Sequence, residues 1–302
     1  MVRGAGVFST YRFRKVVFPG PRRRSRPVNL APVSLALCEP PEESPLSDRA
    51  GQFLNWLLPK AGLDPKAYRG ETLRRRLPAC LRFLRATTPS QAQRILEQNP
   101  GLVTGAVHVM LVGVTSFFRD PDVFQWLADE VLAVREGSHP RLYAWSAGCS
   151  EGSELYSLAI LLAERGRLSQ SYLLGTDCRG EAIEHARRAV YDEAGVRGVP
   201  DVFLQRYFAR QEDGWALSQR IRTEVRWSVS DLLKGIEPGA WDIILFRNTS
   251  MYFRSEALAE LWPRIESSLR PGGILVLGRA ERPMGAKRLS PVRPCIFKRL
   301  RA

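Results

Sequence analysis

Hydrophobic residues change their spacing about halfway along the chain. From Leu46 to His139, short apolar segments recur at helical spacing and are separated by helix-breaking residues. Near the end of this region, Asp120-Pro121 is typical of an N-cap followed by proline at the first helical position. The pattern predicts an all-helical region. Its helices cover 53–59, 68–84 and 89–98, and the last one starts near Asp120.

After Pro140 the pattern changes to apolar runs of strand length that alternate with helical segments. Such alternation predicts an α/β fold in which helices cover both faces of a parallel sheet. A polar stretch over 214–230 alternates with a period of two and is predicted as a short hairpin. The predicted strands cover 142–145, 172–176, 242–246, 273–278 and 291–298, with helices over 154–165, 180–190 and 255–269.

Charge is the most unusual feature of the composition. The 302 residues include 45 Lys plus Arg against 31 Asp plus Glu, a net charge of +14. This excess indicates an acidic partner, which could be nucleic acid, a membrane surface or an acidic protein. The sheet region is neutral, because residues 141–284 hold 19 basic and 19 acidic residues. The excess therefore lies in the helical region and in the two terminal segments.

The first 45 residues differ from the rest of the chain. They carry no acid before Glu39 and end in a proline-rich stretch. We predict that 1–45 is a disordered basic tail, with a transit peptide or a nucleic-acid-binding arm as alternatives. The predicted domains are then a helical domain over 46–139 and an α/β domain over 140–302.

The predicted helix over 68–84 carries much of the basic excess outside the tails. Its leucines recur at steps of three or four from Leu73 to Leu84, so they form one buried stripe and most of its arginines face outward. A solvated face is the simplest interpretation of such a charge run. A docking surface for an acidic partner is the alternative.

Several classes of protein are excluded by the sequence. No run of about 18 apolar residues could span a bilayer, so we expect no membrane insertion. The five cysteines form no CxxC pair and the three histidines are not spaced to share a metal. We therefore expect neither a metal site nor a disulfide framework.

Candidate chemistry follows the first two predicted strands. The loop over 146–154 contains Gly148 and Gly152 and leads into a helix N-terminus, where backbone N–H groups attract an anion. Asp177 follows the second strand, where α/β folds place a carboxylate for ribose hydroxyls. The loop lacks a full GxGxxG, and Glu154 would repel a pyrophosphate. These features favour S-adenosylmethionine over NAD as the cofactor.

Six short stretches together resemble one family, the bacterial chemotaxis receptor methyltransferases of the CheR type. The resemblance runs from about residue 62 to 298. Its motifs are TSFFRD at 115–120, WSAGCSEG at 145–152, YSLAI at 156–160, GTD at 175–177, RN at 247–248 with MYF at 251–253, and LRPGG at 269–273.

The resemblance implies a small helical domain followed by a Rossmann-like S-adenosylmethionine-dependent methyltransferase domain. It also implies a small β-subdomain inserted at about 212–230. The implied activity is O-methylation of glutamate side chains in the acidic methylation region of a chemoreceptor coiled coil. We expect a cytoplasmic monomer that does not act on nucleic acid.

The resemblance also assigns residues. Arg119 and Tyr252 match positions near the transferring methyl group, and Arg74, Arg75 and Arg76 lie on the helix that matches the receptor-docking helix. The implied cofactor-binding residues are Thr115, Arg119, Gly148, Glu154, Asp177, Asp231, Leu232, Arg247 and Asn248.

Some family positions differ in this chain. Gly113 stands where the family has Asn, Ser153 replaces the first Glu of Gly-Glu-Glu-Pro, and Arg279-Ala280 replaces His-Ser. These departures leave two alternatives to a glutamate methyltransferase. One is a degenerate cofactor-binding or docking protein without catalysis, and the other is a nucleic-acid or small-molecule methyltransferase.

Overall fold

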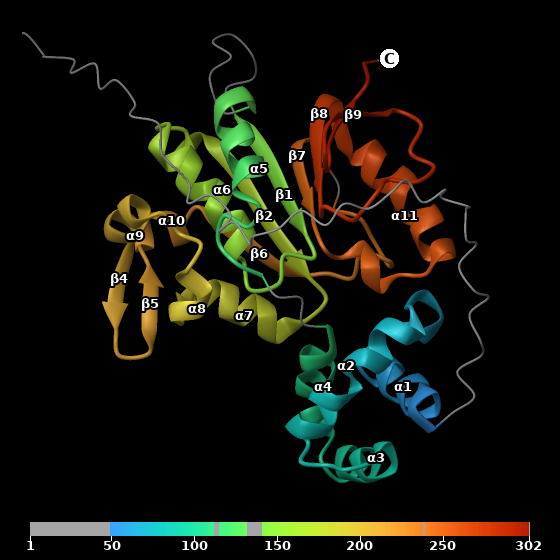
Figure 1. Ribbon diagram of the computed structural model, residues 1–302. Coiled ribbons are helices and arrows are strands. Elements are labelled where there is room, and N and C mark those ends of the chain that lie inside the picture. The colour runs from blue at the N-terminus through green and yellow to red at the C-terminus, as the bar shows by residue number, and fades with distance from the viewer. Residues whose placement is uncertain (1–48, 112–114, 132–140, 238, 302) are drawn as a thin grey trace, which may run out of the picture.

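The computed structural model describes residues 49–111, 115–131, 141–237 and 239–301. The predicted tail over 1–45, the domain boundary near 140 and Gly113 lie outside these residues. In Figure 1 a group of helices lies beside one edge of a large sheet, and further helices pack along that sheet. The first helices are α1 (Arg49–Lys60), α2 (Gly70–Phe83), α3 (Pro89–Gln98) and α4 (Val103–Leu111).

The leucine stripe orients α2 against α1 and α4. Leu73 and Leu77 are buried, while Arg75 is exposed and Arg74 and Arg76 are half-buried. This confirms the predicted apolar stripe. Helix α4 was not predicted as a separate element, because it is apolar on most of its surface and has little helical periodicity. It packs against α2 and also against α7 (Gly180–Arg188) of the sheet region.

The large sheet has seven strands in the order β6, β2, β1, β7, β8, β10, β9. The first five strands in this order are parallel to their neighbours, and β10 and β9 are antiparallel. Their bounds are β1 (Leu142–Ala147), β2 (Ser171–Asp177), β6 (Val225–Val229), β7 (Trp241–Phe246), β8 (Leu269–Leu277), β9 (Leu289–Arg293) and β10 (Ile296–Arg299).

The strand order reverses its direction at β1. The chain runs from β1 outward to β2 and β6, and then returns to β7 on the other side of β1. In open α/β sheets ligands bind at such a switch point, outside the carboxyl ends of the strands. The helices that follow β1 and β2 are α6 (Ser153–Glu164) and α7, and α11 (Ser255–Ser268) precedes β8.

The predicted hairpin over 214–230 is only half correct. β5 (Gly214–Leu217) does pair with β4 (Phe208–Gln211), and with β3 (Val190–Tyr191) on its other side. β6, however, is an edge strand of the large sheet, parallel to β2. Period-two alternation also fits an edge strand with one buried face, which the sequence could not distinguish from a hairpin. The small sheet therefore lies upstream of β6.

Two further differences concern the end of the domain and a helix start. The single closing strand predicted over 291–298 is a hairpin of β9 and β10 that turns at Cys295, whose φ is 61°. Helix α5 (Pro121–Trp126) begins as predicted after Asp120, but the Asp120 side chain makes no capping hydrogen bond. No helix within the described residues is both long and apolar enough to cross a membrane.

Candidate active site

A pocket opens at the carboxyl ends of β1, β2 and β7, where the first helices approach the sheet. Every residue predicted for the cofactor or for methyl transfer lines this pocket; the roles of these residues stay predictions. The lining residues are Tyr68, Leu111, Thr115, Ser116, Arg119, Gly148, Cys149, Ser150, Glu154, Asp177, Cys178, Arg179, Ser230, Asp231, Leu232, Arg247, Asn248, Thr249, Tyr252 and Phe253.

The glycine loop after β1 is shaped by close packing. Gly148 has a φ of 72°, and a Cβ atom there would lie 2.7 Å from the Thr249 Oγ1 atom. Gly152 has a φ of 83°, and its Cβ would lie 2.5 Å from the Trp227 ring. Both positions therefore require glycine. The loop is held against β2 because Gly148 N and Cys149 N both donate to Thr176 O at 2.8 Å.

One end of the pocket holds a network of ionised side chains. Arg247 donates to Glu154 at 3.2 Å and also pairs with Asp120, which in turn accepts from Arg279 at 2.7 Å. Burial raises the pKa of Glu154, and the nearby Arg247 opposes that rise. Burial also acts to raise the pKa of Asp120, but Arg279 and Arg247 outweigh it and hold the pKa below its usual value.

This network explains why Asp120 is not a cap. Its φ of 57° places it in the left-handed region, which turns the carboxylate toward Arg247. Arg279, which stands where the family has His, forms ion pairs with Asp120 and Asp122 that balance its charge. Arg119 is exposed and lies near enough to lower the pKa of both Glu154 and Asp120.

The loop after β7 is fixed by a buried carboxylate. Glu281 accepts from the backbone N–H groups of Asn248 at 2.7 Å, Gly278 at 2.6 Å and Ser250 at 2.8 Å. It also accepts from the Ser250 hydroxyl at 2.7 Å. These bonds hold Asn248 in its left-handed conformation, with a φ of 57°. Glu281 thus positions the loop that leads to Tyr252.

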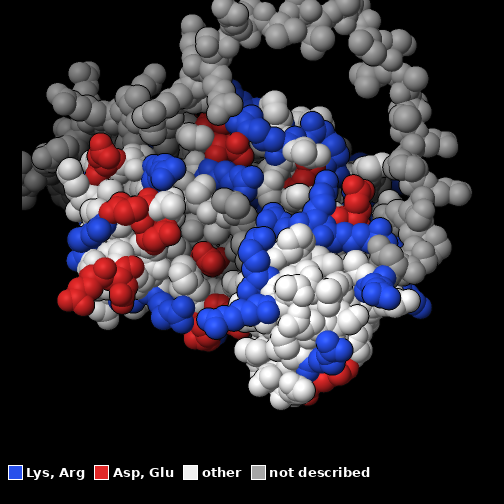
Figure 2. Space-filling view, turned by 60° about the horizontal axis from the view of Figure 1, so that its bottom comes forward, with Lys and Arg blue, Asp and Glu red and all other residues white. Residues whose placement is uncertain are grey.

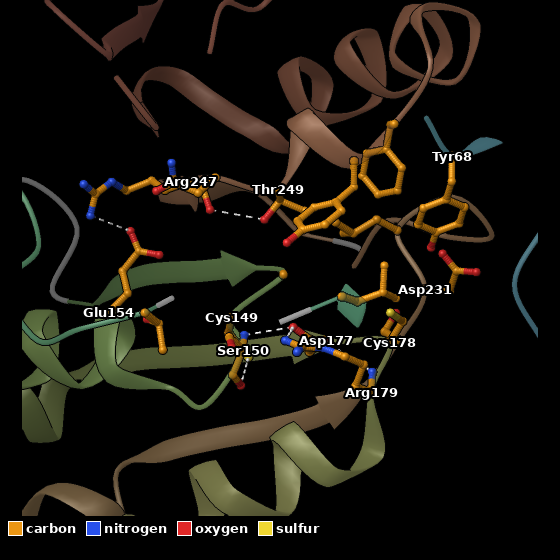
Figure 3. Close-up of a pocket in the computed structure, with 18 of the residues that line it drawn as sticks. Tyr68, Cys149, Ser150, Glu154, Asp177, Cys178, Arg179, Asp231, Arg247 and Thr249 are labelled. Carbon is orange, nitrogen blue, oxygen red and sulfur yellow. Dashed lines mark hydrogen bonds and ion pairs between the residues drawn. The ribbon is translucent and has the colours of Figure 1, made fainter. Parts of the chain in front are cut away.

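The opposite end of the pocket lies between the helical region and β2. Tyr68 stands there beside Asp231 and Cys178, and Asp177 lies between the two ends (Figure 3). Burial raises the pKa of Tyr68 well above its usual value, so its phenol is neutral. Asp231 also accepts a hydrogen bond from Leu233 N at 3.0 Å, which orients its carboxylate.

Asp177 itself is occupied by protein donors. Its oxygens accept from Ser150 N at 2.8 Å, from Arg179 N at 3.0 Å, and from Arg179 Nε and Nη2 at 2.9 and 3.1 Å. Burial of Arg179 acts to lower the pKa of its guanidinium, but Asp177 reverses this and raises it.

Sequence reasoning missed Tyr68 and Arg179 as pocket residues. Tyr68 reaches the pocket only because its segment docks on the loop after β7, and no local pattern could indicate this. Arg179 is two residues from Asp177, so its proximity was a usable signal. No group of three His, Cys, Asp or Glu within the described residues could hold a metal ion.

The family described as CheR methyltransferase, SAM binding domain, matches residues 113–294. The chain belongs to this family. S-adenosylmethionine is therefore its cofactor. The fold is Rossmann-like with a preceding helical region, as expected from the resemblance, although the small sheet lies upstream of its predicted place.

Among its relatives is the Pseudomonas aeruginosa protein named chemotaxis protein methyltransferase 1, which is 34% identical over 200 residues. The match covers 63% of this chain and 73% of that protein. The Listeria monocytogenes protein named chemotaxis protein methyltransferase is 28% identical, and the match covers 73% of this chain and 84% of that one. A TehB-like SAM-dependent methyltransferase of Corynebacterium glutamicum aligns with a TM-score of 0.36 at 15% identity, over 70% of this chain and 97% of that one.

The pocket of this family member fits the two ends of the cofactor. Glu154, Arg119 and Arg247 offer both charges to an ammonium and a carboxylate at one end. Tyr68 and Leu232 offer apolar surface to an adenine ring at the other end, while Asp177 lies between the ends (Figure 3). A zwitterionic amino acid joined to a nucleoside matches this order of charged, polar and apolar groups.

Proposed function

We propose that this protein transfers a methyl group from S-adenosylmethionine to glutamate side chains of a chemoreceptor. The acceptor would be the acidic methylation region of the receptor's cytoplasmic coiled coil. The observation that carries the proposal is the direct bonding of the basic helix α2 to the loop that holds Tyr252. It joins a surface suited to an acidic protein to the mouth of a methyltransferase pocket.

Five hydrogen bonds make this junction, and one of them comes from within α2, where the Thr72 hydroxyl donates to Met251 O at 3.4 Å. Arg69 donates from its backbone N to Tyr252 O at 2.8 Å and from its Nε to Phe253 O at 2.7 Å. In return, Arg254 donates from its backbone N to Ala67 O at 2.8 Å and from its Nε to Tyr68 O at 3.0 Å. The start of α2 and the Tyr252 loop therefore form one unit.

The surface around this unit is basic. Figure 2 shows Lys and Arg side chains along the side of the helical region that faces the sheet region. On α2, Arg75 is exposed, and Arg74 and Arg76 are half-buried. We propose that these arginines attract the acidic coiled coil, and that the helical region predicted over 46–139 is the docking domain.

The chemistry needs little from the protein. When bound, S-adenosylmethionine supplies a methyl carbon that its sulfonium already activates. A glutamate carboxylate is a sufficient nucleophile at neutral pH, so its oxygen can bond to that methyl carbon without a general base. The carbon–sulfur bond would break in the same step, and the sulfur would leave as a neutral thioether. The protein has to align the acceptor and exclude water. We propose that Arg119, exposed at the pocket mouth, orients the acceptor carboxylate and that Tyr252 borders the methyl position.

The experiment is methyl transfer from labelled S-adenosylmethionine to a receptor cytoplasmic fragment. We expect label that base releases as methanol, because carboxyl methyl esters are base-labile. A fragment with its acceptor glutamates replaced by alanine is the control and should stay unlabelled. Base-stable label on RNA or DNA would instead favour a nucleic-acid methyltransferase. Cofactor binding without any transfer would favour a docking protein without catalysis.

Two further properties belong to the proposal. We propose that the protein acts in the cytoplasm, where the methylated part of a chemoreceptor lies, and that it is a monomer. Light scattering behind size-exclusion chromatography should give a mass near 34.0 kDa for the free chain. A mass of twice that value would contradict the monomer.

A further inference from the structure

The carboxylate assigned to the ribose has no acceptor site left for it. A carboxylate offers about four lone-pair sites on its two oxygens. Asp177 Oδ1 accepts from Arg179 N and Nε, and Oδ2 accepts from Ser150 N and Arg179 Nη2. Two of these four donors belong to one guanidinium. Ribose hydroxyls can reach the carboxylate fully only if those two side-chain donors leave.

Arg179 is poorly satisfied in this position. Its side chain is 7% exposed and lines the pocket, yet its Nη1 is buried without a hydrogen-bond partner among the described residues. An unpaired buried donor is unfavourable, so the arrangement is not one that packing alone favours. By contrast, the backbone donors from Ser150 and Arg179 come from loop segments held by other bonds and can stay in place.

We propose that Arg179 is a latch on the ribose subsite: its guanidinium holds Asp177 in the free protein and leaves it when the cofactor binds. The proposal rests on the ribose role of Asp177 and does not depend on which acceptor is methylated. Figure 3 shows the Arg179 side chain extending toward Asp177, with which it is paired. No other cation is bonded to Asp177 among the described residues.

The latch has a consequence for affinity. The Arg179 guanidinium carries a full positive charge and holds the carboxylate through two hydrogen bonds, whereas ribose hydroxyls are neutral donors. The ribose hydroxyls therefore replace stronger donors with weaker ones, and the apparent affinity falls by the fraction of molecules with the latch open. The demethylated product carries the same ribose, so the latch weakens both ligands and favours product release.

The decisive variant is Arg179→Met, which keeps the length of the side chain and removes its donors. We expect the affinity for S-adenosylhomocysteine, measured by calorimetry, to rise about tenfold. We also expect the free variant to melt at a lower temperature, because Asp177 loses its buried countercharge. An affinity that is unchanged or lower would overturn the latch, since a merely structural arginine would lower affinity and stability together.

Three arms make the result specific. The gain in affinity of Arg179→Met should appear with 5′-methylthioadenosine, which carries the ribose, and be absent with homocysteine. It should also vanish when Arg179→Met is combined with Asp177→Ala, as a double-mutant cycle would measure. Arg187→Met is the matched control, because Arg187 pairs with Glu184 at the surface and is not part of the pocket lining. A gain with homocysteine would contradict the ribose subsite.

A second variant and a measurement on the unaltered protein cover the case in which Arg179→Met does not fold. Arg179→Lys keeps the charge but cannot form the two-pronged contact. Its affinity for S-adenosylhomocysteine should therefore lie between those of the unaltered protein and Arg179→Met. In the unaltered protein, the Arg179 Nε–H resonance should exchange with water faster after S-adenosylhomocysteine is added. A resonance that stays protected in the complex would overturn the proposal.

Discussion

Two buried carboxylates, Asp177 in the pocket and Glu281 against the loop after β7, are held in different ways. Glu281 accepts from three backbone N–H groups and one hydroxyl, all within the loops it joins. Asp177 accepts from two backbone N–H groups and from the side chain of Arg179. Backbone donors in packed loops cannot leave without unfolding those loops, whereas a side chain can rotate away.

The difference teaches which parts of the site are fixed. The loop that leads to Tyr252 is set before any ligand arrives, which is what alignment of a methyl acceptor requires. Asp177, which we propose receives the ribose, has a replaceable partner, so cofactor binding there would be an exchange of donors. The first two predictions test the loop that Glu281 holds and the carboxylate of Asp177.

The largest effect on stability should come from removing the Glu281 carboxylate. Glu281→Ala leaves three backbone N–H groups without an acceptor, those of buried Gly278 and Ser250 and of half-buried Asn248, which should lower the free energy of unfolding by about 3–5 kcal/mol. Denaturant titration measures this change. Glu281→Gln keeps one acceptor oxygen, so its free energy of unfolding should lie between those of the unaltered protein and Glu281→Ala. A loss below about 1 kcal/mol for Glu281→Ala would mean that the loop finds other partners.

Asp177→Ala should have the next largest effect, on the cofactor rather than on the loop. Removing the acceptor of the ribose hydroxyls should weaken S-adenosylmethionine binding about 100-fold in calorimetry. Asp242→Ala is the control, because Asp242 also pairs with an arginine but lies near the start of β7, at the end of the strand away from the pocket. The affinity of Asp242→Ala for S-adenosylmethionine should not change. Comparable binding by both variants would place the ribose elsewhere.

Arg119→Ala separates transfer from binding. If Arg119 orients the acceptor carboxylate, kcat should fall about tenfold while the cofactor dissociation constant changes less than about threefold. Single-turnover transfer to a receptor fragment, together with calorimetry, measures both quantities. Equal losses in rate and in cofactor affinity would show instead that Arg119 only binds the cofactor.

The smallest effect concerns docking. Changing Arg74, Arg75 and Arg76 to Gln should weaken receptor binding about threefold to tenfold at low salt, and less at high salt, because exposed charges are screened. Cofactor affinity should stay the same. The matched control changes Lys287, Arg288 and Arg293 to Gln, which removes the same charge from the C-terminal segment. An equal loss in the control would mean that net charge, not α2, attracts the receptor.

Much of the fold could be predicted because its elements have local signals. The leucine stripe predicted the buried face of α2, and the alternation of strands and helices predicted the parallel sheet. β6 was misassigned because alternation defines a half-buried strand but not its neighbour. The pairing of β6 with β2 depends on contacts such as those of Trp227 against Tyr156, which join distant segments.

The site was predictable where residues follow strands directly. Asp177 was identified because it directly follows a strand, at the edge of the sheet where the carboxyl ends of parallel strands meet, whereas Arg247 was assigned through the family resemblance. Tyr68 and Glu281 were not, since their positions depend on the packing of segments that are far apart in the sequence. The role of Arg179 required the hydrogen-bond geometry, because proximity in sequence says nothing about which lone pairs are occupied.

A crystal structure with S-adenosylhomocysteine tests the contrast between the two carboxylates most directly. We predict that the ribose hydroxyls bond to Asp177, that the Arg179 guanidinium has moved away, and that the four bonds of Glu281 are unchanged. A complex in which Arg179 still holds Asp177, or in which the ribose lies elsewhere, would contradict the account.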